Sequence, residues 1–221
     1  MSLQHVTISV EVTSATLGQA WIKLVDQILQ NGTPMGEEGL EVLGIPVRFL
    51  PAVGSDEILE RFADHQMIGE MKKVFFGNDP SSLGHSYAKL IRGPGGRHDL
   101  QDVIELLEQE SLTKRAVVTL PGQAGGKVPC VTAVQFLVRN SIVQTTYFAR
   151  GQDAFKKFYA DALCLVKMAE KVAEALRLSI GPVYGFIGSA HIYHQDMPSI
   201  RQILISAKNY LTQHRQEGIL A

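Results

Sequence analysis

The sequence has only two cysteines, Cys130 and Cys164, in 221 residues. Two cysteines cannot build the disulfide framework of a small secreted domain, and neither belongs to a CxxC pair or lies among histidines at zinc spacing. The sequence therefore excludes a disulfide-stapled fold, predicts no metal site and favours the reducing cytoplasm.

A long hydrophobic run is also lacking. The chain opens with MSLQHVTISVEV, where polar and apolar residues alternate, instead of a basic flank followed by an apolar stretch. No segment approaches the roughly 20 apolar residues that a membrane-spanning helix needs. We therefore expect a soluble, unprocessed chain with no membrane partner.

Charge of one sign is not in excess, since 21 Lys and Arg face 22 Asp and Glu for a net charge of -1. No broad positive field would hold a polyphosphate backbone, so nucleic acid is not expected as a partner, although a local phosphate site stays open. The sequence contains no Walker loop, Rossmann fingerprint, HExxH or GxSxG. Their absence removes the usual nucleotide-hydrolase, dehydrogenase, zincin and esterase interpretations.

Apolar residues make up 45% of the chain, enough for one substantial core, and we expect a single domain over residues 1–221. Strands and helices are mixed without a regular βαβ rhythm, which favours an α+β fold. Ser14 is the expected N-cap of the first helix, Asn31-Gly32 its end, and residues 31–39 a loop. The expected strands are residues 6–12, 40–50, 116–120, 131–138, 142–149 and 183–193, and the expected helices lie within 17–31, 56–74, 100–107, 153–178 (the longest) and 200–211.

Cys130 follows GGKVP, where a flexible segment enters a strand, and such junctions can expose a side chain at a site. A free cysteine is more often a small buried hydrophobe, so both interpretations are open. A nucleophilic thiolate would need a nearby cation, for which Arg150 at the end of the next strand is a candidate. Cys164 lies among core positions of the long helix and is expected only to pack.

Other polar residues also allow two interpretations. His191 and Tyr193 are two residues apart on a strand, so they share a face that either meets a ligand or faces solvent. Lys114 and Arg115 are either a solvated charge pair or an anion-binding pair. Asp161 interrupts an apolar helical stretch, where it is either exposed on the polar face or directed at a ligand.

Together, four segments resemble the thymidylate synthase family in their order and spacing: LTKRAVVTL, VPCVTAVQFLV, YFARGQDAFKKFYADA and GSAHIY. The resemblance covers residues 83–193 well and the N-terminal third only loosely. It implies a thymidylate synthase-like α+β fold, in which helices flank a mixed sheet and one sheet face packs in a homodimer with shared active sites.

The resemblance also implies a reaction and its residues. Cys130 matches the nucleophile that attacks C6 of a pyrimidine nucleoside monophosphate, Glu70 the catalytic glutamate and Tyr87 a tyrosine beside the reacting carbon. Asp153 matches an aspartate near the folate. The implied one-carbon donor is 5,10-methylenetetrahydrofolate or another reduced pterin.

The same comparison implies the nucleotide contacts. Arg150 matches an arginine that binds the phosphate and supports the cysteine. Lys114 and Arg115 match a pair that reaches the phosphate in the other subunit's site. His191 and Tyr193 match the pair that hydrogen-bonds the sugar 3′-hydroxyl.

Asp161 stands where thymidylate-forming members have an asparagine that pairs with uracil. Cytosine reverses the donor and acceptor roles at N3 and C4, which suits a carboxyl group that accepts from the amino group and, when neutral, donates to N3. Aspartate here is typical of the cytidylate hydroxymethylases. The resemblance therefore implies hydroxymethylation of CMP or dCMP, with a compact thymidylate synthase methylating dUMP and a catalytically silent nucleotide-binding dimer as alternatives.

Other departures lie beside the nucleophile, at the phosphate arginine and on the folate side of the site. The family's Cys-His is Cys130-Val131 here, and its Gln-Arg-Ser is Ala149-Arg150-Gly151. The chain is shortened between residues 77 and 87 and at its C-terminus. Tryptophans that border the folate in the family have no counterpart, because the single Trp21 lies elsewhere.

Overall fold

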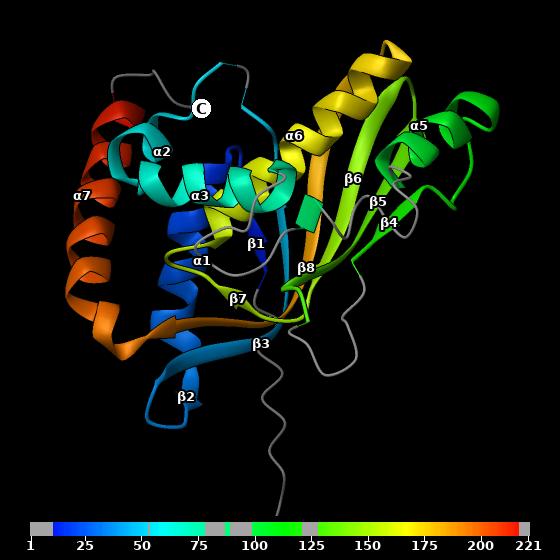
Figure 1. Cartoon of the computed structure of the whole chain (residues 1–221). Coiled ribbons are helices and arrows are strands. Elements are labelled where there is room, and N and C mark those ends of the chain that lie inside the picture. The colour runs from blue at the N-terminus through cyan, green and yellow to red at the C-terminus, as the bar shows by residue number, and fades with distance from the viewer. Residues whose placement is uncertain (1–10, 53, 78–86, 89–98, 121–127, 217–221) are drawn as a thin grey trace, which may run out of the picture.

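The computed structural model describes residues 11–52, 54–77, 87–88, 99–120 and 128–216. These residues form a mixed sheet of eight strands in which the main order is β1-β3-β8-β6-β5-β4 (Figure 1). The short strands β2 and β7 pair with β3 and β8. The strands are β1 (Val12–Thr13), β2 (Thr33–Met35), β3 (Gly39–Phe49), β4 (Val117–Thr119), β5 (Val131–Arg139), β6 (Ile142–Ala149), β7 (Gln152–Asp153) and β8 (Ser179–Tyr193).

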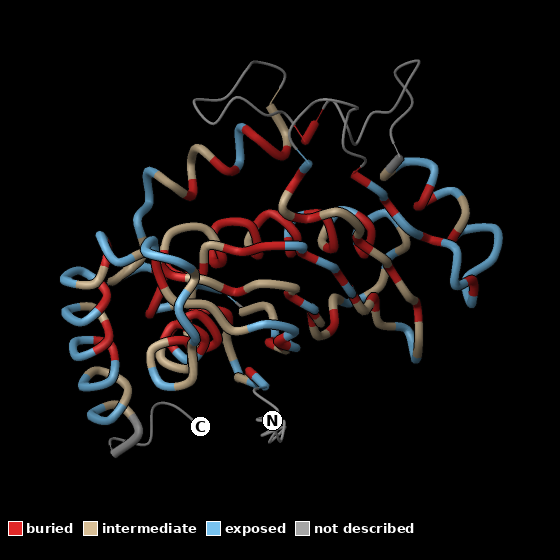
Figure 2. The backbone as a smooth tube through the Cα atoms, turned by 90° about the horizontal axis from the view of Figure 1, so that it is seen from below, coloured by how far each residue is buried: buried red, intermediate tan, exposed pale blue. Residues whose placement is uncertain are grey.

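Helices cover one face of this sheet. Helix α6 packs on β6 and β8, α1 on β3 and α5 beside β4, while α7 is the outermost helix and exposes its outer side (Figures 1 and 2). This arrangement confirms the predicted α+β class. No described helix is long and apolar enough to cross a membrane. The helices are α1 (Leu17–Asn31), α2 (Glu57–Phe62), α3 (His65–Phe76), α5 (Asp99–Gln109), α6 (Phe158–Leu176) and α7 (Met197–Gln216).

Trp21 lies at the centre of the core between α1 and the start of α6. Its side chain is 1% exposed, and its indole N–H donates to the Phe155 carbonyl at 3.0 Å. The ring packs on Tyr159 with centroids 4.7 Å apart. The single tryptophan is therefore a packing residue of the hydrophobic core.

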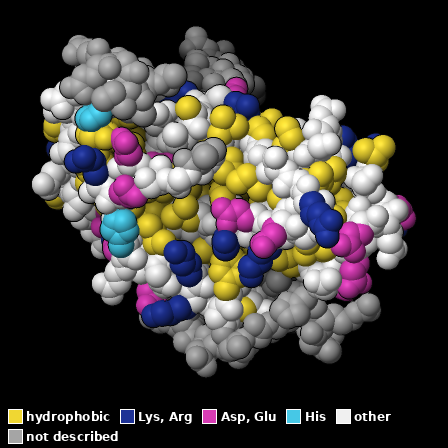
Figure 3. Space-filling view, turned by 90° about the horizontal axis from the view of Figure 1, so that it is seen from above, with side chains coloured by type: hydrophobic (Ala, Val, Ile, Leu, Met, Phe, Trp, Pro, Cys, Tyr) yellow, Lys and Arg dark blue, Asp and Glu magenta, His cyan; other side chains and the backbone are white. Residues whose placement is uncertain are grey.

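The opposite sheet face carries large apolar side chains that remain accessible in the single chain. Phe148 and Phe186 are 41% and 46% exposed, and their rings stack with centroids 6.1 Å apart. Val143 and Tyr147 point to the helical side and are buried. On the surface seen in Figure 3, Lys and Arg lie among Asp and Glu, as the balanced composition predicts.

Local sequence patterns predicted most helices and strands correctly. The hairpin between β5 and β6 turns at Asn140 and Ser141, whose φ values are 52° and 61°, the left-handed geometry of a tight hairpin. The α1 helix ends at Gly32, whose N–H donates to the Ile28 carbonyl at 2.8 Å. Most of the expected opening strand, residues 6–12, lies outside the described residues.

Four expectations are wrong. Thr16, not Ser14, caps α1, since its hydroxyl accepts from Gln19 N–H. The expected helix 56–74 is two helices, because the Asp64 carboxylate caps a new start at α3. The expected loop 31–39 contains β2, which pairs with β3. The longest helix is α7, with 20 residues against 19 in α6.

Candidate active site

The candidate site lies at one end of the sheet, where β5 begins and β6 and β8 end. Cys130 directly precedes β5 and Arg150 directly follows β6, and the Arg150 N–H donates to the Cys130 carbonyl at 2.9 Å. Strand β7 pairs with the end of β8 so that Asp153 lies opposite His191. The fold therefore brings together residues that are up to 61 positions apart (191 − 130).

Tyr87 packs directly against Cys130. Its hydroxyl oxygen accepts from the Cys130 N–H at 3.0 Å, and the ring lies 4.7 Å from that of Phe75 on α3. Burial raises the pKa of Tyr87 far above its ordinary value, so the hydroxyl keeps its proton. A protonated hydroxyl can donate to the Cys130 sulfur when that sulfur is a thiolate.

The charges around Cys130 oppose one another. Burial, followed by the negative charge of Asp161, raises the pKa of the Cys130 thiol. The cations of Arg150 and Lys157 and a hydrogen bond from Tyr87 act in the other direction. Cys130 is therefore a thiol surrounded by the groups that would stabilise its thiolate.

Arg150 also holds the segment in front of the cysteine. Its Nη2 donates to the Val128 carbonyl at 2.7 Å, and its Nε donates to the Pro129 carbonyl at 3.1 Å. The side chain is exposed, which leaves the guanidinium accessible to an anion. The sequence alone could not show this proximity of Arg150 to Cys130.

Asp161 is buried in the first turn of α6, so the interpretation that it lies on a solvated helix face is wrong. The residue is 3% exposed, and its Oδ2 accepts from Gln152 Nε2 at 2.8 Å. Its Oδ1 is buried without a hydrogen-bond partner among the described residues. Burial is the main cause that raises the pKa of Asp161 to about 7, against the Gln152 hydrogen bond and the Lys157 charge.

Asp153, His191 and Tyr193 complete the cluster. Asp153 Oδ1 accepts from the N–H groups of Phe155 and Lys156 at 3.1 and 2.9 Å, and burial raises the pKa of this carboxyl group. The half-buried rings of His191 and Tyr193 meet edge to face with centroids 5.3 Å apart. The pair therefore offers two polar groups from one strand face, beside a carboxylate.

Lys114 and Arg115 do not join this cluster within one chain. Val117 of β4 lies opposite Gln135, five residues beyond Cys130 (135 − 130), which is roughly 17 Å along the strand. Lys114 and Arg115 lie still further from Cys130 along this register, and both are exposed.

Glu70 lies on α3, the helix whose Phe75 packs on Tyr87 beside Cys130. Its carboxylate pairs with Lys73 on the same helix at 2.8 Å. Its catalytic role stays a prediction. In the part of the chain that the structure describes, no group of three His, Cys, Asp or Glu could hold a metal ion.

Sequence reasoning missed two site residues. Gln152 is 1% exposed and contacts Asp161, but an amide between Gly151 and Asp153 carries no sequence signal of its own. Lys157 acts electrostatically on Cys130, Asp153 and Asp161. Its position four residues before Asp161 places both on one helix face, and this spacing could have indicated it.

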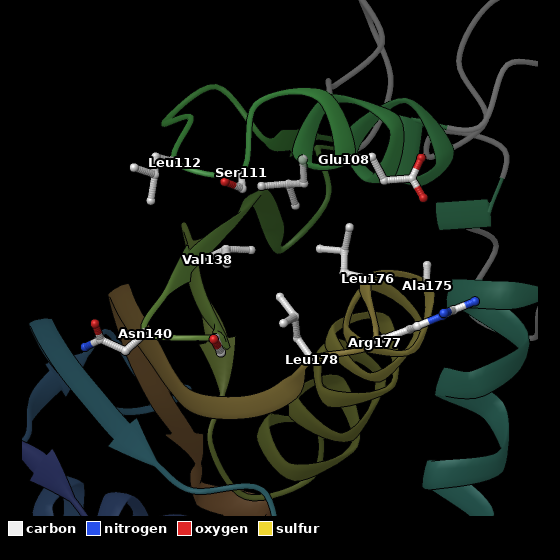
Figure 4. Close-up of a pocket in the computed structure, with 11 residues that line it drawn as sticks. Glu108, Ser111, Leu112, Val138, Asn140, Ala175, Leu176, Arg177 and Leu178 are labelled. Carbon is white, nitrogen blue, oxygen red and sulfur yellow. The ribbon is translucent and has the colours of Figure 1, made fainter.

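A separate pocket of about 660 Å³ lies at the other end of the sheet (Figure 4). Val138, Leu176 and Leu178 form its apolar wall, and Glu108 and Arg177 lie at its border. It contains none of the predicted site residues. The candidate site around Cys130 is therefore separate from this hollow.

Comparisons with known proteins point to one family. The thymidylate synthase family model matches residues 57–215. A "Putative thymidylate synthase" of Methanococcoides burtonii is 26% identical over 204 residues, covering 87% of this chain and 94% of that protein. The protein of the same name from Methanothermobacter marburgensis is 22% identical over 220 residues, covering 88% and 97%. A third, from Methanocaldococcus jannaschii, is 29% identical over 119 residues, covering 49% and 54%.

The family match includes the whole segment from Cys130 to Tyr193. The resemblance seen in the sequence is thereby confirmed, and with it a class of reaction. The chain belongs to the thymidylate synthase family, whose enzymes transfer a one-carbon unit to a pyrimidine nucleotide.

Proposed function

We propose that this chain hydroxymethylates a cytosine nucleotide, CMP or dCMP, at C5. One observation carries the proposal: Asp161 is buried beside Cys130 with one carboxyl oxygen lacking a partner among the described residues. A buried group of this kind needs a ligand or a proton. With a pKa of about 7, Asp161 is available as a neutral acid that donates to N3 of cytosine.

Cys130 supplies the nucleophile. Its thiolate forms a bond to C6, and the electron pair of the C5–C6 bond makes C5 nucleophilic enough to capture the one-carbon unit. Loss of the C5 proton to a base, together with release of the donor from the transferred carbon with its bonding electron pair, would leave an exocyclic methylene group at C5. Water adds to the resulting exocyclic methylene group as the Cys130 sulfur departs from C6. The product carries a hydroxymethyl group, and the thiolate is regenerated.

The surrounding residues favour this addition. Arg150 and Lys157 stabilise the thiolate by charge, and the Tyr87 hydroxyl donates to it. A cytosine bound by neutral Asp161 also removes the negative charge that raises the pKa of Cys130. Base recognition and nucleophile activation would therefore support each other.

His191 and Tyr193 would bind the sugar 3′-hydroxyl from their shared strand face, and Arg150 the phosphate. Lys114 and Arg115 lie too far from Cys130 to reach the same nucleotide in one chain. We therefore assign them to the phosphate in the site of a second copy. Phe148 and Phe186, on the accessible sheet face, would pack in that homodimer.

The family implies a folate-type one-carbon donor. The hydrogen-bonding groups at Asp153 fit such a molecule. Two backbone N–H groups occupy Oδ1, whereas Oδ2 makes no hydrogen bond to any described residue. A carboxylate oxygen suits the N–H groups of a 2-amino-4-oxo-pterin ring. When bound, methylenetetrahydrofolate supplies carbon at the oxidation level of formaldehyde. Asp153 would hold the ring, and Glu70 would assist proton transfer to or from water.

Methylation of dUMP is the second candidate. The relatives are named thymidylate synthases, and an ionised Asp161 can accept from N3–H of uracil. In that state, however, the O4 atom of uracil faces no donor from the carboxylate. The buried acid therefore favours cytosine.

The test compares CMP, dCMP, UMP and dUMP as substrates of the full chain. Exchange of the C5 hydrogen with solvent requires addition of Cys130 to C6 but no folate, and product formation adds methylenetetrahydrofolate. We expect exchange and hydroxymethylation with a cytosine nucleotide, and loss of both in Cys130→Ser. Exchange and methylation restricted to uracil nucleotides would support the second candidate. Nucleotide binding without any exchange would show a silent binding protein.

A further inference from the structure

Resting on the proposed function, we propose that Gln152 is a positioning residue: it fixes which oxygen of Asp161 meets the base and supplies an acceptor beside it, so that the pair together selects cytosine over uracil.

The Gln152–Asp161 contact is buried. Gln152 belongs to β7 and lies opposite Ala190 of β8, so its backbone is held by the sheet. Its side chain is 1% exposed, that of Asp161 is 3% exposed, and Nε2 and Oδ2 are 2.8 Å apart. An amide N–H can only donate. Oδ2 is therefore the acceptor oxygen, and the proton of a neutral Asp161 belongs on Oδ1.

Oδ1 is also the oxygen that lacks a partner in the described part of the chain. Protonated, it is a hydrogen-bond donor. The other amide atom, Gln152 Oε1, is bonded to the same carbon as Nε2 and makes no hydrogen bond to a described residue. The two side chains thus offer one donor and one acceptor.

This pair complements cytosine. N3 of cytosine accepts and its 4-amino group donates, whereas uracil presents N3–H and the O4 acceptor. Uracil would place donor against donor and acceptor against acceptor in a buried site. Sites built around buried hydrogen-bonding groups reject the wrong partner by factors on the order of 10² to 10⁴.

Several ionisable groups act on or are affected by Asp161. The Gln152 hydrogen bond and Lys157, the N-cap of α6, lower its pKa, while Asp153 raises it. Asp161 in turn raises the pKa values of Cys130, Tyr87, Tyr147 and Cys164. Because Gln152 is the neutral member of this group, its removal changes hydrogen bonding without adding or removing a charge.

The decisive variant is Gln152→Met, which keeps the side chain's length and removes both amide functions. The matched control is Gln30→Met, because Gln30 Nε2 donates to Asp26 at 2.9 Å in an exposed pair on α1. Both are made in the full chain, and circular dichroism checks their folding. Dissociation constants for dCMP and dUMP are measured by calorimetry in each protein.

We expect the dCMP preference to fall about 10- to 100-fold in Gln152→Met and to stay unchanged in Gln30→Met. Independently of any nucleotide, ¹³C NMR of the Asp161 carboxyl group, assigned with Asp161→Asn, should show a higher pKa in Gln152→Met. An unchanged Asp161 pKa together with an unchanged dCMP to dUMP ratio would overturn the role of Gln152.

A further measurement needs no variant. The 2-pyrimidinone nucleotide keeps N3 as an acceptor and lacks the 4-amino group, so wild type should bind it about tenfold or more weakly than dCMP. Equal binding of the two nucleotides would show that Gln152 Oε1 does not accept from the 4-amino group. If wild type shows no C5 exchange with cytosine nucleotides, the proposed function fails, yet the NMR titration still decides whether Gln152 positions Asp161.

Discussion

Asp161 and Cys130 are both shielded from water, so a negative charge on one group disfavours a negative charge on the other. The fold adds Lys157 and Arg150 as opposing cations. Substitution of the acid therefore changes the reactivity of the nucleophile as well as base recognition.

Asp161→Asn should lower the pKa of the Cys130 thiol, because it removes the negative charge that follows burial among the causes of its rise. The measurement is the pH dependence of Cys130 alkylation by iodoacetamide, followed by mass spectrometry. Above pH 7, where wild-type Asp161 is ionised, the variant should react faster. Glu170→Gln is the control, since Glu170 forms an exposed ion pair with Lys167 on the same helix. Coincident profiles for wild type and Asp161→Asn would contradict this coupling.

The same acid makes stability depend on pH. The folded pKa of about 7 exceeds the ordinary value near 4, so the folded chain binds more protons between these values and loses stability as pH rises through them. Asp161→Asn removes this loss. Relative to wild type, the variant should gain about 3 kcal/mol in unfolding free energy between pH 5 and pH 8. Urea unfolding at both pH values measures this gain, and a pH-independent difference would show that Asp161 ionises normally in the folded chain.

At the scale of elements, the site depends on how the segment before β5 is held against the end of β6. Arg150 joins the two through the carbonyls of Val128 and Pro129. A planar guanidinium can make these contacts together and still face an anion, whereas an ammonium group cannot reproduce that geometry.

Arg150→Lys should therefore lower kcat/KM by about 100-fold while charge is conserved. Part of the loss should appear as a raised pKa of Cys130 in the alkylation assay and part as weaker nucleotide binding. Arg177→Lys, at the exposed end of α6, is the control and should leave both unchanged. Full activity in Arg150→Lys would show that only its charge matters.

At the scale of the whole molecule, the position of Lys114 and Arg115 predicts that a complete site needs two copies. A Cys130→Ser chain and a Lys114→Ala/Arg115→Ala chain should each be inactive. Mixed after mild unfolding and refolding, they should recover about a quarter of wild-type activity, since half of the dimers are mixed and each has one complete site. Mixing Cys130→Ser with Cys130→Ala is the control. Without recovery in the first mixture, these cations do not serve a partner's site.

Much of this protein follows from its sequence. Asn31-Gly32 ends α1, the Asn140-Ser141 turn sets the hairpin, and apolar periodicity places α6, because each of these is a signal within a few residues. The four ordered motifs predicted the family, which the family match confirms. The break between α2 and α3 was missed because the Asp64 cap competes with a helix pattern that continues across it.

Only the tertiary structure decided the state of the site. Burial of Asp161, its contact with Gln152 and the distance of Lys114 from Cys130 each depend on strands and helices that meet across the sheet. The sequence determined which groups are present, since residue type and local spacing are written in it. Their pKa values, partners and separations come from solvent exclusion and long-range pairing, which no local pattern contains.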